Sequence, residues 1–527
     1  MENIVNTVNG VVWSNWLVCL CLLSGIYFSL RTRFSQVRNL KEMVHLLFAG
    51  EKSEEGISSF QGFCTALAGR IGTGNIAGVA TAIAWGGPGA LFWMWMIAFL
   101  GAGSAFAEST LGQLYKEKHE GQYCGGPAYY IEKGFGKKGW AKVYGMVFAI
   151  VTVISVGILL PGVQSNSIAV AVKNAFGVNV TITGIGLVIL VGVVIFGGIK
   201  RIGSAAEFIV PFMGGAYILM ALIIIIVHIG YLPHVLALIF KSAFGAEATF
   251  GGILGSTIAW GVKRGVYSNE AGQGTGPQAS SAAEVSHPAK QGFVQAFSVY
   301  VDTLFVCSAT GFMILMTDNY TTFSEKTHEI IFNAGPEYTI DQIGPAYTQG
   351  AVNTLINGFG AAFVAIALFF FAFTTLMAYY YIAEVNVNYI VKRFTGKGNI
   401  WAVHALKLIL LFMTYYGSVK TSDLAWAMGD IGVGLMAWLN IIAILALSNI
   451  VMKCFKDYEA QMKSGKVSEE ITFDPVPLGI KGADFWEELN KEKTDSKIIA
   501  LDKNGSQFWE PFFIVMKLYI IWFMDNL

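Results

Sequence analysis

The chain has 527 residues, with 35 basic and 35 acidic side chains and a formal net charge of zero. Hydrophobic residues make up 54% of it and charged residues only 13%, a composition far from that of ordinary soluble domains. The balanced charge gives no basic surface for a nucleic acid and no acidic tail for a polycation. The composition therefore predicts a protein of the lipid bilayer with no nucleic-acid partner.

Apolar stretches long enough to cross a hydrocarbon core about 30 Å thick recur along the chain. We place eleven such spans at residues 12–30, 59–84, 88–108, 144–168, 182–200, 206–230, 250–275, 291–316, 353–384, 401–418 and 425–452. Basic residues gather after the odd-numbered spans, for example in residues 31–41 and 116–138, and are few in the opposite loops. By the positive-inside rule the N-terminus lies outside and the C-terminus in the cytoplasm, in a multi-pass protein of a bacterial-type cytoplasmic membrane.

The two ends of the chain and its cysteines complete this outline. The first residues, MENIVNTVNG, lack a basic region, so we expect the first span to be a retained helix and not a cleaved signal. The last apolar run, FWEPFFIVMKLYIIWFM, is short and interrupted by Lys517, which favours an interfacial helix over a twelfth crossing. The six cysteines show no metal-binding spacing, and we expect reduced thiols.

The span count suggests an internal symmetry. If the first span is set aside, ten remain, and they divide into two halves of five that lie in opposite orientations, as in many secondary transporters. The expected fold is an all-α polytopic membrane protein of eleven transmembrane helices, one extra N-terminal helix plus two inverted five-helix repeats. The expected parts are residues 1–57 (first helix and cytoplasmic linker), 58–230 (first repeat), 231–452 (second repeat) and 453–527 (cytoplasmic tail).

The first span of each half carries a glycine-rich interruption. These are AGRIGTGNIAGVA at residues 68–80 and GVYSNEAGQGTGPQ at residues 265–278. Glycine clusters favour an unwound backbone, which is tolerated at membrane depth only where it meets a ligand, water or buried protein. The alternative is close helix packing through small residues, but two interruptions in matching positions favour a binding site for a zwitterion and a cation.

Polar residues lie inside both interruptions. Thr73 and Asn75 offer neutral ligands in the first, or cap the second half-helix. In the second, Asn269 and Glu270 stand beside Gly272. A carboxylate at membrane depth is usually functional, although Glu270 has the alternative of pairing with Arg264 as a structural or gating bridge.

Other polar residues occur in the remaining spans. Thr374 and Thr375 are consecutive hydroxyl residues in an apolar stretch, and they either complete an oxygen shell for a cation or bond back to their own helix. Gln164 follows Pro161 and either meets a substrate or satisfies a proline-broken turn. Asp302 and Glu108 are further acids in the spans, without identifiable partners.

At GRIGTGNIAGVATAI (69–83), RGVYSNEAGQGTGPQ (264–278), GGPAYYIEKG (125–134) and FAFTTLMAYYY (371–381) the sequence resembles the alanine or glycine:cation symporter family. The resemblance covers all eleven spans. It implies a leucine-transporter-type fold and sodium-driven uptake of alanine or glycine. It also implies substrate contacts at Thr73, Gly74, Asn75, Gln164, Asn269 and Gly272, and sodium ligands at Ala68, Ile71, Thr374 and Thr375.

One position departs from the expected family pattern. Tyr379 stands where we expect a tryptophan, and a smaller ring in the substrate pocket would admit a larger amino acid such as glutamine. Glu270 also keeps proton coupling open. The sequence has no phosphate-binding loop of the kind that an ATP-driven pump uses. A channel and an intramembrane enzyme are remote alternatives.

The expected partners are a small amino acid, sodium as co-transported ion and the lipid bilayer, with no cofactor. The sequence leaves the oligomeric state open, and we expect the monomer to be the functional unit.

Overall fold

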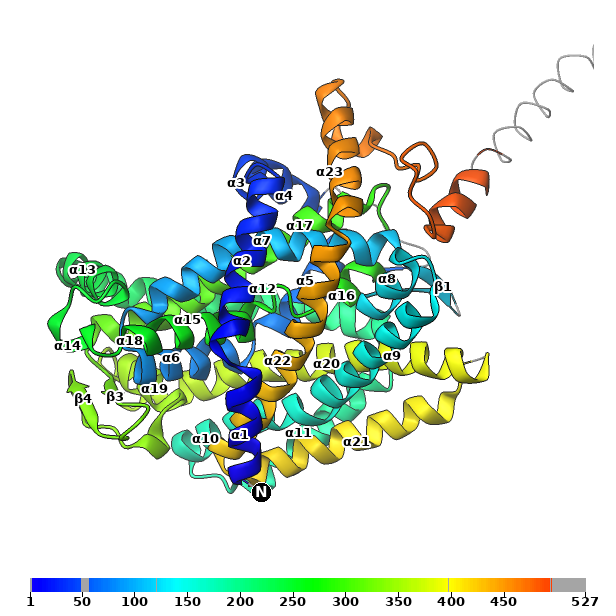
Figure 1. Cartoon of the computed structure of the whole chain (residues 1–527). Helices are drawn as coiled ribbons and strands as arrows, with labels where there is room; N and C mark the ends of the chain where they lie inside the picture. Colours follow the sequence, from blue (N-terminus) through cyan, green and yellow to red (C-terminus); the bar gives the residue numbers. More distant parts are fainter. Residues whose placement is uncertain (1, 49–55, 120, 397, 493, 495–527) are drawn as a thin grey trace, which may run out of the picture.

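The computed structural model describes residues 2–48, 56–119, 121–396, 398–492 and 494 (Figure 1). Helices dominate this part of the chain. Its strands form two short antiparallel hairpins, β1 (Glu117–His119) with β2 (Gln122–Cys124) and β3 (Thr321–Phe323) with β4 (Ile330–Asn333). The predicted all-α class is confirmed.

The N-terminal segment contains four helices, α1 (Glu2–Val12), α2 (Asn15–Arg31), α3 (Ser35–Arg38) and α4 (Leu40–Phe48). The first two form one apolar span, Ile4–Arg31, which begins before the predicted residue 12. The reason is tertiary, because the end of α1 is held against α22 (Ser422–Ala446). Trp13 donates to the carbonyl of Asp430 (2.8 Å), and Trp438 donates to the carbonyl of Val12 (3.0 Å).

The elements of the first half follow from residue 59. A capping box starts this half, in which Ser58 accepts from the Gln61 amide while the Gln61 side chain accepts from the Ser58 amide. The helical elements are α5 (Ser59–Arg70), η1 (Gly74–Gly78), α6 (Val79–Gly86), α7 (Ala90–Leu114), α8 (Pro127–Gly134), α9 (Gly139–Ile154), η2 (Ser155–Leu159), α10 (Leu160–Phe176), α11 (Val180–Ile195), α12 (Gly198–Val227), η3 (Ile229–Tyr231) and α13 (Leu232–Ala243).

The second half begins with a short helix and ends with three long ones. Its helical elements are α14 (Ala248–Gly251), α15 (Leu254–Asn269), α16 (Gly276–Ala282), α17 (Pro288–Tyr300), η4 (Val301–Cys307), α18 (Ser308–Met316), η5 (Ile340–Gln342), α19 (Pro345–Asn353), α20 (Phe359–Thr395), α21 (Ile400–Val419) and α22.

The multi-pass character predicted from hydropathy is confirmed, because eight helices of the described chain are long and apolar enough to cross a membrane. Two predicted spans, 59–84 and 250–275, correspond to α5 with α6 and to α15 with the backbone after it, and both are interrupted as predicted. A third, 182–200, corresponds to the shorter apolar helix α11. The total of eleven and the division into repeats stay predictions.

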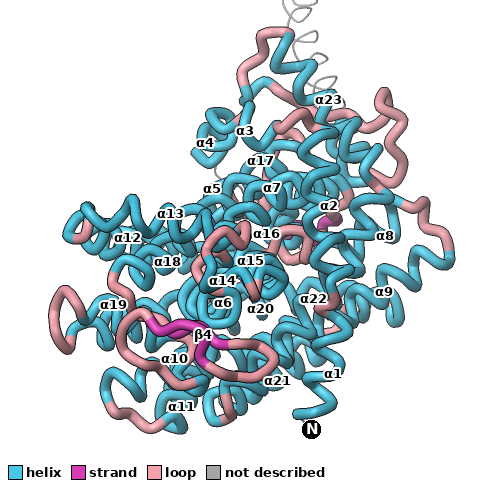
Figure 2. Tube along the Cα trace, turned by 60° about the vertical axis from the view of Figure 1, so that its left-hand side comes forward, coloured by secondary structure: helices cyan, strands magenta, loops and turns pink. Residues whose placement is uncertain are grey.

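The interrupted helices lie in the middle of the molecule. Figure 2 shows α6, α15, α16 and α20 at the centre, surrounded by α1, α9, α11, α12 and α13. α15 and α17 pack against α7, and α20 packs against α5 and α10. This arrangement places both glycine-rich interruptions away from the surface.

The C-terminal segment includes α23 (Ser448–Lys463) and η6 (Ser468–Glu470). In Figures 1 and 2, α23 and the start of α1 lie at opposite ends of the molecule. Trp486 is buried and donates to the carbonyl of Gln113 (3.1 Å), so part of the predicted tail packs on the helical body. The predicted interfacial helix at the end of the chain lies outside the described residues.

Candidate functional site

The first interruption is an unwound turn held by side-chain hydrogen bonds. α5 ends at Arg70, and the next residue, Ile71, has a ψ of 86° that leaves the helical region. The Gly72 amide donates to Asn75 Oδ1 (2.8 Å), and the Thr73 amide donates to Gln164 Oε1 (3.0 Å). The Thr73 hydroxyl is fully buried and has no partner in the structure. Thr73, Asn75 and Gln164 are therefore brought together as predicted, and the Thr73 hydroxyl remains without a hydrogen-bond partner.

Gln164 reaches this turn because its helix is irregular just before it. The π-helical turn η2 precedes Pro161, which has no amide hydrogen to continue the helical ladder. Gln164 lies almost one turn later and is 1% exposed. Tyr379 of α20, also buried, has Gln164, Tyr267 and Glu270 as its electrostatic neighbours. Both predicted contacts thus lie beside the interruptions.

Thr375 faces the backbone oxygens of the first interruption. Its Oγ1 lies 2.9 Å from the Ala68 carbonyl oxygen, 3.4 Å from that of Ile71 and 3.0 Å from that of Phe371 in its own helix. A Cβ on Gly72 would lie 2.5 Å from the same hydroxyl, so only glycine leaves this space open. Three of the four predicted cation ligands therefore converge, and neutral oxygens of this kind suit a hard cation.

Thr374 takes a different direction from its neighbour. Its hydroxyl donates to the carbonyls of Phe370 (3.1 Å) and Phe371 (2.9 Å) and lies 3.9 Å from Met213 Sδ. This is the back-bonding alternative, which is common for threonine inside helices.

The second interruption is a turn in the left-handed region of backbone space. Glu270 has φ of +55°, and Gly272 and Gly274 have φ of +79° and +86°. Glycine adopts these angles without strain, which explains why glycines follow Glu270. The Asn269 side chain closes the end of α15, with Oδ1 accepting from the Ala271 amide (3.0 Å). Asn269 acts here as a cap of the interruption.

Glu108 of α7 anchors the same turn. Its carboxylate accepts from the amides of Gly272 (3.3 Å) and Gly274 (3.1 Å) and from Asn440 Nδ2 (2.6 Å). Asn440 also donates to the carbonyl of Gly272 (2.9 Å). Both the amide and the carbonyl of Gly272, a predicted substrate contact, are therefore hydrogen-bonded to protein groups.

Asp302 links the two interruptions. It lies in the π-helical turn η4, a kind of irregularity that is frequent at functional sites. Its carboxylate accepts from Asn75 Nδ2 (2.6 Å), from Ser268 Oγ (3.0 Å) and from Thr303 Oγ1 (2.7 Å). The sequence alone did not identify partners for Asp302. The structure gives it Asn75 from the first interruption, Ser268 from the second, and the adjacent Thr303.

The alternative in which Glu270 pairs with Arg264 is contradicted by the structure. Arg264 forms a two-pronged ion pair with Asp430 of α22 (2.9 and 2.8 Å), and Lys263 joins it at 2.7 Å. Arg264 lies within α15, whereas Glu270 follows the end of that helix in a left-handed turn, so the two side chains face different neighbours. Glu270 instead accepts a hydrogen bond from Thr275 Oγ1 (2.7 Å).

Arg264 also packs between aromatic rings at the edge of a large cavity. Its guanidinium lies 4.6–5.5 Å from the ring centroids of Trp260, Tyr267 and Trp426. The cavity measures about 580 Å³ and is lined by residues of α1, α6, α15 and α22. A Cβ on Gly78 of η1 would lie 3.8 Å from both Arg264 and Trp426. Arg264 and its aromatic neighbours thus stand between the cavity and the first interruption.

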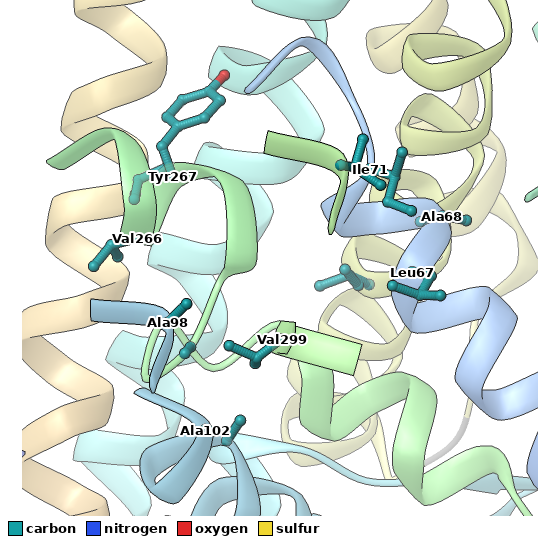
Figure 3. Close-up of a cluster of buried hydrophobic side chains, with 14 of the residues drawn as sticks. Leu67, Ala68, Ile71, Ala98, Ala102, Val266, Tyr267 and Val299 are labelled. Carbon is teal, nitrogen blue, oxygen red and sulfur yellow. The ribbon is translucent and has the colours of Figure 1, made fainter. Parts of the chain in front are cut away.

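Apolar side chains surround the interruptions. Figure 3 shows Leu67 and Ala68 of α5 with Ile71 just after that helix on one side, Val266 and Tyr267 of α15 on the other, and Val299 of α17 between them. All six are buried. The polar groups therefore lie in surroundings with little water, where charge interactions are strong.

Sequence reasoning missed two charged residues at the site, Arg70 and Asp430. Arg70 is 1% exposed and bonds to Ser298 Oγ and to Gln295 Oε1 of α17, whereas its Nε and Nη2 have no partner. The signal was available, because each is a charged residue inside a predicted apolar span.

A network of ion pairs joins the loop after α7 to the end of α20. Glu117 lies 3.1 Å from Lys133 and 3.0 Å from Lys392, and Arg393 lies 2.7 Å from Glu132. Burial alone would raise the pKa of Glu117, but Lys133 and Lys392 outweigh it and hold this pKa at about 2. The loop and α20 are therefore tied together at neutral pH.

His287 forms a second link, between α17 and α23. Its ring accepts from the Ala289 amide (3.0 Å) and lies 3.1 Å from Asp457 Oδ2. Burial lowers the pKa of His287, and Asp457 opposes this only in part. The imidazole is therefore held neutral, as its acceptor role toward Ala289 requires.

Comparisons with known proteins give a consistent picture. The family model described as the sodium:alanine symporter family matches residues 1–472. The putative sodium/proton-dependent alanine carrier protein YrbD of Bacillus subtilis (strain 168) is 58% identical over 92% of this chain and 98% of its own length.

Two further relatives cover nearly the same length. The sodium/proton-dependent alanine carrier protein of Bacillus sp. (strain PS3) is 50% identical over 87% of this chain and 100% of its own. The probable sodium/glutamine symporter GlnT of Bacillus subtilis (strain 168) is 41% identical over 94% of this chain and 98% of its own.

Proposed function

The chain belongs to the sodium:alanine symporter family, and from this premise we propose that it imports a small neutral amino acid, alanine or glycine, together with sodium. Family membership agrees with the transporter interpretation and excludes the enzyme alternative. The observation that carries the proposal is the convergence of the Ala68 and Ile71 carbonyls with the Thr375 hydroxyl at an unwound turn.

Sodium occupies this convergence point. The ion draws the two carbonyls and the hydroxyl together and so orders the backbone of the first interruption. Thr374, the fourth predicted ligand, joins the shell only by turning its hydroxyl away from Phe370 and Phe371. Three protein oxygens leave room for other ligands in the ion's shell.

The amino acid binds beside the ion. Its carboxylate is attracted to the N-terminal end of the second half-helix, which begins with η1 at Gly74. The unpartnered Thr73 hydroxyl supplies a hydrogen bond, and Gln164 and Tyr379 close the site on the other side. Asn75, Asn269 and Gly272 act mainly by fixing the shape of the two turns.

Coupling follows from binding linkage. If sodium orders the turn that the amino acid needs, the amino acid raises sodium affinity by the same factor. A sodium gradient then drives accumulation as the repeats 58–230 and 231–452 move around the site. Arg264 with Asp430 closes the side of the large cavity, and the network around Glu117 closes the opposite side. We place the N-terminus outside and the C-terminus in the cytoplasm, with the monomer in the bilayer as the functional unit.

The test is uptake of labelled alanine into proteoliposomes under an inward sodium gradient, compared with potassium or choline. Sodium-dependent accumulation that unlabelled glycine blocks supports the proposal. Inhibition by glutamine alone keeps the mechanism and changes the substrate, an outcome favoured by Tyr379 and by the similarity to the probable sodium/glutamine symporter GlnT. Uptake that does not respond to the sodium gradient overturns the proposal in favour of proton coupling or a channel.

A further inference from the structure

A second cavity lies between the end of α2 and helix α23. Figure 1 shows α3, α4 and α23 at the same end of the molecule, away from the start of α1. The cavity measures about 390 Å³ and shares no lining residue with the cavity beside Arg264. Its charged lining consists of four basic side chains and one acidic side chain: Arg31, Arg33, Lys456, Lys463 and Glu459.

The basic side chains of this cavity are not neutralised by neighbouring acids. Glu459 pairs with Arg38, which lies outside the lining, at 2.8 Å. Arg31 donates to a tyrosine hydroxyl and to an asparagine side-chain oxygen, which are neutral groups. The other three basic residues form no ion pair with a described residue. Four positive charges around one cavity repel each other, and a bound anion would relieve this repulsion.

The turn between α2 and α3 holds the basic residues of α2 against α23. Arg33 and Phe34 have φ of +54° and +53°, angles that residues other than glycine seldom adopt. The Arg38 side chain holds this turn by donating to the carbonyls of Arg33 (2.8 Å) and Thr32 (3.1 Å). The same side chain donates to Glu459 of α23 (2.8 Å). Arg38 therefore fixes the shape of the cavity and leaves its other cations free to bind a ligand.

An apolar stripe on α2 leads to this cavity. Trp16, Leu23 and Leu30 are 60–77% exposed, and they follow one another at intervals of seven residues, which places them on one face of the helix. They belong to the apolar span Ile4–Arg31, so this face meets the acyl chains of the bilayer. The stripe ends one residue before Arg31. A lipid that lies along α2 thus brings its headgroup to the basic residues.

We propose that this cavity binds the headgroup of an anionic glycerophospholipid, with the phosphate between Arg33 and Lys456 and the acyl chains along the α2 stripe. Guanidinium and ammonium groups both bind phosphate oxygens, and basic pockets at the ends of transmembrane helices suit anionic headgroups. A zwitterionic lipid would bring its own ammonium group among four cations, so a net negative headgroup is preferred. This site does not depend on which amino acid or ion the protein carries.

The test counts lipids bound to the purified full-length protein in a mild detergent by native mass spectrometry. The protein is titrated with phosphatidylglycerol and, in parallel, with phosphatidylcholine of the same acyl chains. One phosphatidylglycerol molecule should bind at least about tenfold more tightly than phosphatidylcholine. Because the measurement requires no transport, its result is separate from the uptake test of the proposed function.

Two matched double variants locate the site. Lys456→Gln with Lys463→Gln should weaken phosphatidylglycerol binding about thirtyfold, because two positive charges are lost from the cavity. Lys138→Gln with Lys142→Gln is the same chemical change at two exposed lysines outside the cavity, and it should leave the affinity unchanged. If the first variant fails to fold, Arg33→Gln takes its place, with an expected loss of about fivefold.

Four results would overturn the inference. Equal binding of the two lipids would show that the headgroup charge is not recognised. Unchanged affinity in the cavity variant, or an equal loss in the control variant, would place the lipid elsewhere. Soluble glycerol 3-phosphate that binds as tightly as the lipid would identify a site for a free phosphate ester in place of a lipid site.

Discussion

Thr374 and Thr375 are adjacent residues with the same side chain, and both hydroxyls bond to the Phe371 carbonyl of their own helix (2.9 and 3.0 Å). Successive residues of an α-helix are rotated by about 100°, so the two side chains reach different further partners. Thr375 also reaches the Ala68 and Ile71 carbonyls, whereas Thr374 bonds to Phe370. The pair therefore offers a matched comparison for the cation site.

Thr375→Ala should raise the half-saturating sodium concentration by about tenfold or more, because a ligand to a charged group is lost. Thr374→Ala should change it far less. Sodium titrations of alanine uptake measure both, and Thr375→Ser should restore the affinity. Equal effects of the two alanine variants would contradict the proposal that Thr375, and not Thr374, binds the cation.

Gly72→Ala should abolish uptake, because the added Cβ would lie 2.5 Å from Thr375 Oγ1 and 3.0 Å from Gln164 Oε1. Gly78→Ala in the same interruption is the control, since its nearest neighbours would be 3.8 Å away. Uptake rates, with the amount of folded protein checked by size-exclusion chromatography, separate the two. A fully active Gly72→Ala variant would show that this turn does not need an open space.

At the scale of elements, each of two helix contacts is formed around one acid, Asp430 or Asp457. α15 meets α22 through Arg264, Lys263 and Asp430, and all three are at least largely buried. α17 meets α23 through His287 and Asp457. In both contacts one acid binds the basic groups of the neighbouring helix, so removing the acid weakens the contact between the two helices.

Asp430→Asn should destabilise the protein by about 3–5 kcal/mol, the typical cost of leaving buried charges without their partner. Thermal unfolding in detergent measures this cost. Asp423→Asn, an exposed acid on the same helix, is the matched control and should have a much smaller effect. Equal unfolding temperatures for Asp430→Asn and the unaltered protein would contradict this account of the ion pair.

Acidification should weaken the contact between α17 and α23. The pKa of His287 is lowered by burial, so the unfolded chain binds the proton more readily, and stability falls as the pH drops below about 6.5. His287→Asn keeps a cap for the Ala289 amide but cannot titrate in this range. The unfolding temperature of this variant should change less between pH 7 and about pH 5. The same slope in both proteins would assign the acid sensitivity to other groups.

At the scale of the whole molecule, helix α1 begins on the side opposite to helix α23. The start of α1 and helix α23 occupy opposite ends of the structure (Figure 1), as an odd number of crossings requires. This separation, together with the basic loops, supports the proposed orientation.

In cells that produce the protein with Cys19 replaced by serine, a cysteine placed at Asn3 should react with an impermeant maleimide added outside. A cysteine placed at Lys463 on α23 should react only after the membrane is permeabilised. Labelling is read on the purified protein. Reaction of the second position in intact cells would reverse the orientation.

The sequence by itself determined the membrane class, the family resemblance and the place of both interruptions, because hydropathy and glycine clusters are local properties of the chain. It also placed Thr73, Gln164 and Thr375 among the site residues. What only the tertiary structure decided are the pairings: Asp430 with Arg264, Asp302 with Asn75, and Glu108 with the amides of the second interruption. These partners are more than 150 residues apart along the chain. Which buried charges meet depends on the rotation and packing of whole helices, and the order of residues along one helix does not contain that information.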